Sequence, residues 1–324
     1  MKQQEPLFDQ EYNGEDSVFG FQPTLPGDCN VESFIVENIT PYYGNEDFLA
    51  DPTDRTLKAL AKLQTLLEEE QERGGVWAID TEIPSTITSH APGYLLSESD
   101  DIIKGLQTDA ALKRSCKPRG GFKVVEKALK GYGYEPSASM KATYTQDVKT
   151  HNDYVFSMYT SEMKKARHTH LITGLPDAYG RGRLIGDYRR IALYGIDDLI
   201  QRKQYDLEAI SGSSLNAMRL RGEISNQIQA LENLLVMADK YGVDLRRPAS
   251  NFKEAVQALW FGLLGALKEE DGAATSAGRW DAFLDIYAER DLKSGLVTEI
   301  DLQVIHCSLF IRLILIRLLI LLFF

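Results

Sequence analysis

The chain has 324 residues, of which 44% are hydrophobic and 26% are charged, and this composition is typical of a soluble globular protein. Its net charge of −11 argues against a nucleic-acid partner, because neutralising phosphates requires a surplus of clustered cations. The three cysteines, Cys29, Cys116 and Cys307, are far apart and odd in number. They predict a reducing, cytoplasmic location and offer no disulfide framework.

Residues 1–30 are polar, rich in Gly, Pro and Asp, and without a period. We therefore expect an extended or partly ordered polar N-terminal arm here. The segment has neither the apolar core of a secretory signal nor the basic character of a transit peptide.

The first helical pattern begins at Asp54, which is predicted to be the N-cap. One side of this helix carries five leucines, at positions 57, 60, 63, 66 and 67. The pattern ends in the polar run 68–75, whose glutamates at 68–70 are interpreted as a solvated helix end and not as a metal site. Strand signals are weak and short, at 86–88 and 122–125.

The later part of the chain predicts three further helices. The clearest spans 214–241, where apolar residues repeat at alternating spacings of four and three and Gly242 is the predicted stop. Asn251 and Glu254 resemble a capping box before the apolar run 255–267, which is apolar on nearly every side and so predicts a buried helix. The third helix spans 282–293 and closes with Gly295. The chain is therefore predicted to be mainly helical.

The C-terminal sixteen residues, LFIRLILIRLLILLFF from Leu309, carry only two charges, Arg312 and Arg317. A helix that spans a membrane needs about 20 predominantly apolar residues. Two arginines within a shorter run weigh further against insertion. We interpret 300–324 as a divergent apolar C-terminal helix or tail, and a membrane anchor stays the less favoured alternative.

The most informative stretch is 173–197, TGLPDAYGRGRLIGDYRRIALYGID, which holds four arginines and five glycines. Glycine allows close approach to the backbone, and a guanidinium matches a carboxylate with two parallel hydrogen bonds. The GRGR core therefore predicts a site for a small anion on a tight turn. The structural alternative is that Arg183 pairs with Asp177 or Asp187 and only braces the turn.

Three other interpretations of sequence motifs are disfavoured. The glycines at 180, 182 and 186 have the spacing GxGxxxG, which is not the GxGxxG of a dinucleotide site, and no β-branched strand precedes them. His168 and His170 lie two apart with no obvious third ligand, so we interpret them as surface histidines and not as a metal site. The GRGR motif and the RGG motif at 119–121 could suggest an RGG-type RNA-binding protein. They are isolated and lie in an acidic chain, so this interpretation is disfavoured.

The 173–197 stretch closely resembles the signature of pyruvate formate-lyase (formate C-acetyltransferase), a glycyl-radical enzyme family. Five other segments agree with that family in the same order along the chain, and the resemblance runs from about 31 to 299. These segments are 42–49 (YYGNEDFL), 85–94 (STITSHAPGY), 105–114 (GLQTDAALKR), 272–279 (GAATSAGR) and 283–295 (FLDIYAERDLKSG). Such a dense run is not expected from a diol dehydratase of the same superfamily.

The resemblance implies an α/β fold, the N-terminal part of a ten-stranded glycyl-radical-enzyme barrel, with 31–299 as the matching portion of the domain. It implies the conversion of pyruvate and coenzyme A to acetyl-CoA and formate in anaerobic metabolism. In the family, a glycyl radical passes its spin to an adjacent cysteine pair, and the acetyl group is held on a cysteine until coenzyme A removes it. Members of the family form homodimers and are activated by a radical S-adenosylmethionine enzyme.

Carried onto this chain, the resemblance implies that Arg183 binds the pyruvate carboxylate and that Ala273 lies against the substrate. Arg181, Arg189 and Arg190 are expected to be structural, and His90, although in a matched segment, receives no role. The chain contains no adjacent cysteine pair and no RVSGY-type radical motif, both of which would lie beyond Phe324, so we expect no catalytic, metal or cofactor residue in it. Two alternatives stay open: a catalytically inactive fragment, or a membrane-anchored remnant with a binding or regulatory role.

Overall fold

The computed structural model describes residues 51–116, 122–147, 156–172, 186–269 and 277–316. Within these ranges the chain is mainly helical, as predicted. The elements in chain order are α2 (Asp54–Glu72), β1 (Ala78–Asp80), β2 (Lys113–Ser115), α3 (Phe122–Gly131), α4 (Ala138–Ala142) with a π-helical turn (Thr143–Asp147), α6 (Ser161–His168), α8 (Arg189–Tyr194), α9 (Ile196–Ala209), α10 (Leu215–Lys240), α11 (Phe252–Glu269), α12 (Trp280–Lys293) and α13 (Glu299–Ile314).

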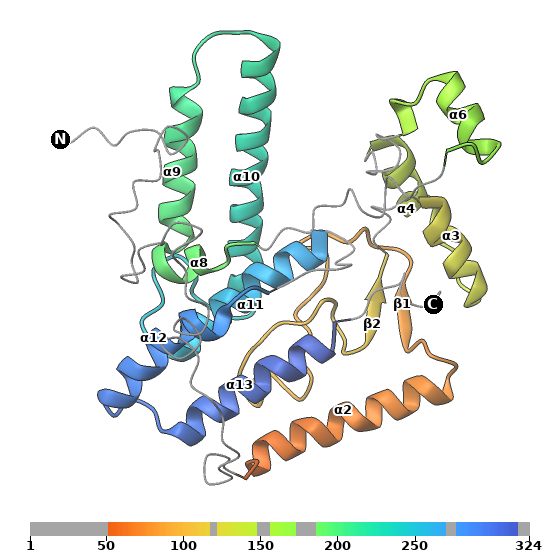
Figure 1. Cartoon of the computed structure of the whole chain (residues 1–324). Helices are drawn as coiled ribbons and strands as arrows, with labels where there is room; N and C mark the ends of the chain where they lie inside the picture. Colours follow the sequence, from red (N-terminus) through yellow and green to blue (C-terminus); the bar gives the residue numbers. More distant parts are fainter. Residues whose placement is uncertain (1–50, 117–121, 148–155, 173–185, 270–276, 317–324) are drawn as a thin grey trace, which may run out of the picture.

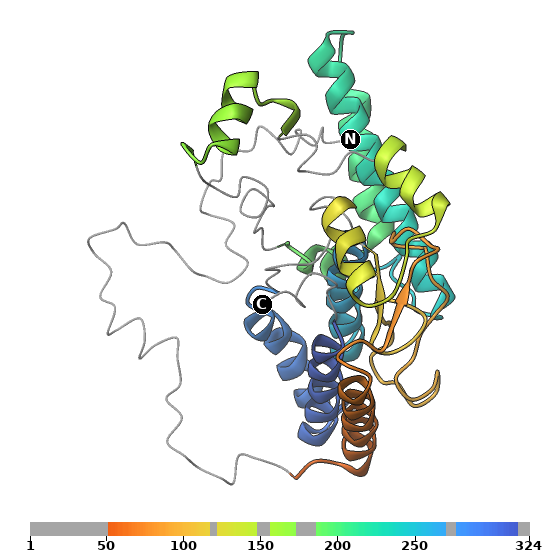
Figure 2. The ribbon, with the colours of Figure 1, turned by 90° about the vertical axis from the view of Figure 1, so that its right-hand side faces the viewer.

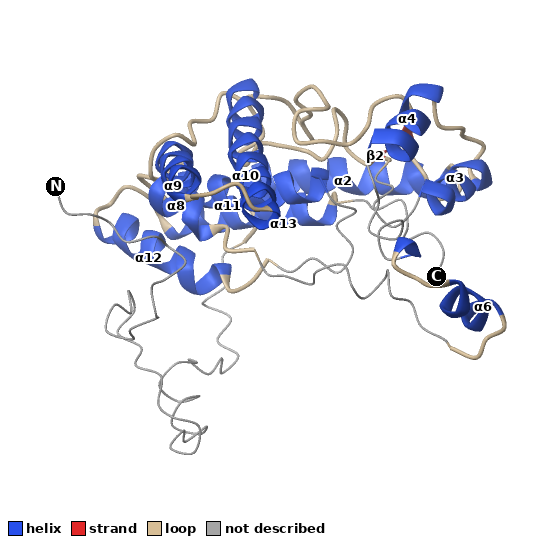
Figure 3. Cartoon of the chain, turned by 90° about the horizontal axis from the view of Figure 1, so that it is seen from above, coloured by secondary structure: helices blue, strands red, loops and turns tan. Residues whose placement is uncertain are grey.

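Helix α11 is the centre of the fold. It is buried on nearly every side, as its apolar sequence predicts, and contacts α8, α10, α12 and α13. Helices α9 and α10 form an antiparallel hairpin that rises from this layer (Figure 1). Helices α3 and α4 lie at the far end of the molecule from α12 (Figure 3). The main hydrophobic core therefore surrounds α11.

The caps of α10 and α11 explain why these helices could be predicted. The Ser214 side chain accepts a hydrogen bond from Ala217 N, and Gly242 has φ +64°, so both predicted ends of α10 are confirmed. At α11, Asn251 Oδ1 accepts from Glu254 N at 2.9 Å. The Glu254 carboxylate instead accepts from Ser250 N and Oγ, so only half of the predicted capping box forms.

Helix α2 differs from its prediction in two respects. Its N-cap is Thr53, whose hydroxyl accepts from Thr56 N, and Asp54 is the first helical residue. Its acidic end is not fully solvated, because Glu70 is buried and forms an ion pair with Arg114 at 2.7 Å. Arg114 lies in β2, so this pair ties α2 to the sheet. The sequence alone does not show that Glu70, one of three consecutive glutamates, pairs with an arginine as distant as Arg114.

The two predicted strands are wrong. Residues 86–88 form a turn, in which Ser89 Oγ donates to Thr86 O, and 122–125 begin helix α3. The strands of the described residues are β1 and β2, which pair in parallel with Ile79 opposite Arg114. With three residues each, they are too short to show a period-2 pattern.

Helix α13 packs its apolar run into the protein. It begins with a capping box between Thr298 and Asp301 and lies beside α2 (Figure 2). Leu309, Ile311 and Leu315 are buried, and so is Arg312, which forms an ion pair with Asp101 at 2.7 Å. One side of the run is therefore part of the core as far as Ile316, while Phe310 and Ile314 are exposed. Among the described helices, none is both long enough and apolar enough to cross a membrane.

Candidate functional site

Arg183 and Ala273, the residues predicted to bind substrate, both lie outside the described residues. The described ranges nearest to them begin at Gly186, three residues after Arg183, and end at Glu269, four residues before Ala273. These flanks belong to α8 and α11, which are in direct contact.

A glycine lets α8 lie directly on α11. A Cβ atom added to Gly262 would lie 2.8 Å from Ile191 Cδ1 and 2.9 Å from Tyr188 Cδ1. The Tyr188 ring also meets the first residue of α12, Trp280, edge to face with 6.1 Å between ring centroids. The segments that carry Arg183 and Ala273 therefore both begin from one packed unit made by α8, α11 and α12.

A cavity of about 340 Å³ lies beside this unit, between α8, α9, α10, α11 and the turn that carries Ile87. Asp187 and Arg190 line it from the α8 side, and Ala266 lines it from α11. Because Asp187 follows the first predicted substrate segment and Ala266 precedes the second, the flanks of both segments border the same cavity.

Two adjacent arginines take different roles at this cavity. Arg189 Nε and Nη2 donate to the two carboxylate oxygens of Asp187 at 2.6 and 3.2 Å, and this hydrogen bonding to the carboxylate raises the pKa of Arg189. This is a structural role of the kind predicted. The half-buried Arg190 lines the cavity and forms no ion pair or side-chain hydrogen bond with the residues that the structure describes. Its place at the cavity was not predicted.

A buried polar cluster lies at the carboxyl end of β1. His90 Nε2 lies 3.0 Å from Asp80 Oδ2, and His90 Nδ1 lies 2.8 Å from Ser89 Oγ. Burial lowers the pKa of His90, and the neighbouring Lys268 ammonium lowers it further, against the opposing effect of Asp80. The neutral ring therefore donates from Nε2 to Asp80, and its unprotonated Nδ1 faces the hydroxyl oxygen of Ser89, whose proton is donated to Thr86 O. These hydrogen bonds hold the turn at 86–90, from which Ile87 lines the cavity.

Lys268 is the last buried residue of α11 before the segment that carries Ala273. Its side chain is 1% exposed, and it forms no ion pair with a carboxylate of the described ranges. Burial lowers its pKa to about 8, and Lys240 adds to this effect. The sequence holds a signal for its burial, because a lysine near the end of a helix that is apolar on all sides has no solvated face.

The described cysteines, Cys116 and Cys307, are both free thiols. Cys116 is fully buried, its Sγ donates to Asp80 O, and burial raises its pKa to about 12. Because the thiolate is the reactive form of cysteine, this thiol is inert at neutral pH. Cys307 is half-buried and unpaired, and Cys29 lies outside the described residues.

No group of three or more His, Cys, Asp or Glu side chains in the described ranges is arranged to hold a metal ion. His168 and His170 are exposed at the end of α6, which is the surface position predicted for them.

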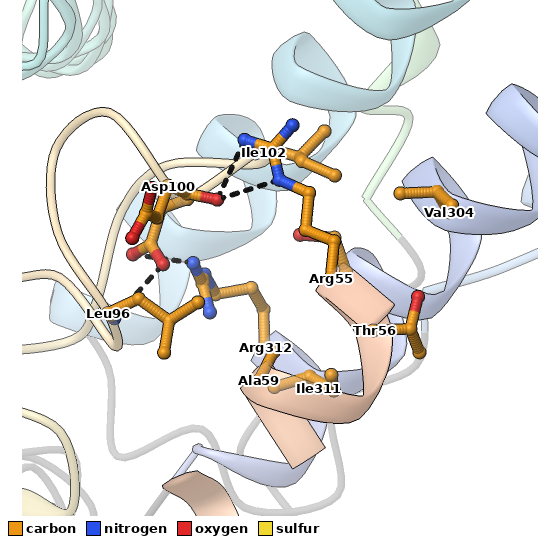
Figure 4. A pocket seen from close by; sticks show the side chains of 11 residues that line it. Arg55, Thr56, Ala59, Leu96, Asp100, Ile102, Val304, Ile311 and Arg312 are labelled. Atoms are coloured by element: carbon orange, nitrogen blue, oxygen red, sulfur yellow. Dashed lines mark hydrogen bonds and ion pairs between the residues drawn. The ribbon is translucent and has the colours of Figure 1, made fainter. Parts of the chain in front are cut away.

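A second hollow lies between α2, α13 and the loop around Asp100, but it measures only about 20 Å³ (Figure 4). Arg55 donates to Asp100 O at its edge, and Arg312 points toward Asp101. This space suits a single water molecule and no larger ligand. Of these two spaces the 340 Å³ cavity is therefore the better candidate for a binding site, and it borders the predicted substrate segments, whereas a third cavity of about 410 Å³ is lined by Lys104, Asp244 and Lys253.

The sequence matches the family model described as "Pyruvate formate lyase-like" over residues 26–320. It is 45% identical over 296 residues to the formate acetyltransferase of Haemophilus influenzae. That alignment covers 89% of this chain and 38% of the relative, so the chain spans well under half of that protein's length.

Solved structures of dehydratases share the fold. The glycerol-bound B12-independent glycerol dehydratase of Clostridium butyricum superposes with a TM-score of 0.63 at 16% identity, over 83% of this chain and 40% of that chain. A structure on 1,2-propanediol dehydration in Roseburia inulinivorans gives 0.56 at 17% identity, over 81% and 38% of the two chains. At these identities the likeness concerns the fold alone.

Proposed function

Because the chain belongs to the pyruvate formate lyase-like family, we propose that it forms the pyruvate-binding wall of a formate C-acetyltransferase. The observation that carries this proposal is the 45% identity to a formate acetyltransferase over 296 residues. The dehydratase structures resemble the chain at only 16 and 17% identity, so they do not favour dehydration over pyruvate cleavage.

In this proposal Arg183 binds the pyruvate carboxylate and Ala273 leaves room for the substrate beside the backbone. A guanidinium suits this task, because its planar fork makes two parallel hydrogen bonds to a carboxylate. A small side chain at 273 lets the ligand approach closely and helps to exclude water from a radical reaction. The contact between α8 and α11 supports the pairing, since the segments carrying these two residues leave from the same packed unit.

The reaction breaks the C1–C2 bond of pyruvate, releases C1 as formate and transfers the acetyl group to coenzyme A. The family supplies a glycyl radical and a cysteine pair for this bond cleavage. Neither an adjacent cysteine pair nor an RVSGY-type motif occurs in the 324 residues, and the part of the reaction proposed for this chain is to bind and orient pyruvate through Arg183 and Ala273. The ten-stranded barrel, the homodimer and the activating enzyme are parts of the same proposal.

The test is Arg183→Gln in the complete anaerobic protein, with formate release measured as a function of pyruvate concentration. A charge-assisted hydrogen bond contributes about 1.5–3 kcal/mol, so kcat/KM for pyruvate should fall by about tenfold to a hundredfold. The KM for coenzyme A should be unchanged. The matched control is Arg189→Gln, because the Arg189 guanidinium is held by Asp187. Equal pyruvate dependence in the two variants would show that Arg183 does not bind the carboxylate.

A further inference from the structure

We propose that the 340 Å³ cavity between α8, α9, α10 and α11 binds a short aliphatic monocarboxylate, with Arg190 holding the carboxylate and the apolar walls holding the hydrocarbon chain. This site is argued from described residues alone and assigns the carboxylate to Arg190, whereas the proposed pyruvate contact is Arg183.

The walls of the cavity suit a hydrocarbon chain. Ile87, Leu199 and Leu234 line it, and all three are buried members of the main core. Gly265 keeps the space between two of them open, since a Cβ atom there would lie 3.3 Å from Leu234 Cδ1 and 4.0 Å from Ile87 Cδ1. The exposed Gln227 of α10 also lines the cavity, so a ligand can enter from solvent on that side.

The charge at the cavity selects an anion. Arg190 has no ion-pair or side-chain hydrogen-bond partner in the described ranges, so it is an uncompensated cation beside apolar surface. The other two charges are already engaged, because Asp187 is bound by Arg189 and Lys203 lies 3.3 Å from Asp206. A free, half-buried guanidinium at an apolar wall is the arrangement that recognises a carboxylate with an apolar body.

The same residues limit the ligand to one negative charge. Asp187 lines the wall that holds Arg190, and a second anionic group of a ligand would meet this carboxylate. The volume falls at the lower end of the range of about 300–1,000 Å³ that is usual for small-molecule sites. A monocarboxylate with a short aliphatic chain meets both limits, whereas formate would leave the apolar walls uncovered.

The experiment is calorimetric titration of the protein with hexanoate, formate and hexanamide. Hexanoate should bind saturably at one site, while formate lacks the apolar chain and hexanamide lacks the charge, so both should bind at least about tenfold more weakly. Arg190→Gln should weaken hexanoate binding by about tenfold or more. Ala266→Leu should weaken it independently, because the larger side chain enters the cavity while Arg190 is retained.

The matched control is Arg202→Gln on α9, because Arg202 is bound to Asp198 at 2.6 Å and does not line the cavity. It should leave hexanoate binding unchanged. Three results would overturn the proposal: no saturable heat with hexanoate, equal affinity in the Arg190→Gln variant, or loss of binding in Arg183→Gln alone. The third would place hexanoate in the pyruvate site, and none of the three would bear on pyruvate cleavage itself.

Discussion

Removing Arg312 should destabilise the protein strongly, because its partner Asp101 would keep a buried charge. Arg312 Nη2 lies 2.7 Å from Asp101 Oδ2, both side chains are 2% exposed, and Arg312 Nε donates to Ile103 O at 3.0 Å. Breaking a buried pair from one side costs about 3–5 kcal/mol. We expect about 3 kcal/mol for Arg312→Met, because Asp101 still accepts two hydrogen bonds, from Leu95 N and Leu96 N.

The assay is urea denaturation of the variants Arg312→Met, Asp101→Asn and their combination. The double variant should be destabilised by about 2 kcal/mol less than the sum of the single variants, since it leaves no lone buried charge. Lys293→Met is the control, because its ion pair with Glu289 is exposed, and its unfolding midpoint should not move. A cost below about 1 kcal/mol for Arg312→Met, or strict additivity in the cycle, would refute the buried pair and the packing of α13 that depends on it.

Two further predictions concern stability. The pKa of Lys268 is lowered from 10.5 to about 8, so between these pH values the folded chain binds fewer protons than the unfolded chain, and the free energy of unfolding should rise by about 3 kcal/mol across that window. Urea denaturation at pH 7 and pH 10 should show this rise in the unchanged protein and not in Lys268→Met. An equal rise in the variant would contradict the assignment. Gly195→Ala should cost more than about 2 kcal/mol, because Gly195 has φ +75° and a Cβ there would clash with Arg246 O. Gly242→Ala, at φ +64° with nothing within 4 Å, should cost only about 1 kcal/mol in the same assay, and equal costs at the two glycines would contradict the predicted clash.

Helices α10 and α11 could be predicted because their signals are local. Ser214, Asn251 and Gly242 are caps that act within a few residues of the helix they limit, and the apolar period between them is long. Strands β1 and β2 could not be predicted in this way, since three residues show no period and their pairing joins segments far apart in the chain. The two valines and the phenylalanine of 122–125 favoured a strand, but the segment opens helix α3.

Arg183 and Ala273 are predicted from a family motif and lie outside the described residues, and the cavity beside their flanks was not predicted. Adjacent arginines give no sequence signal for which one will bind Asp187 and which will line a cavity, because the choice depends on where α8 meets α11. Arg312 was interpreted as one of two charges in an apolar tail, yet it finds Asp101 across the core. Partners that distant in sequence are set by tertiary packing, and a single sequence does not reveal them.

The central proposal is that this chain is the pyruvate-binding part of a formate C-acetyltransferase and not part of a dehydratase. The most direct measurement is product analysis of the native protein, purified without oxygen and supplied in parallel with pyruvate plus coenzyme A, with glycerol and with 1,2-propanediol. The account predicts formate and acetyl-CoA in equal amounts from pyruvate and no product from glycerol or 1,2-propanediol. Absence of formate together with loss of water from glycerol or 1,2-propanediol would contradict it.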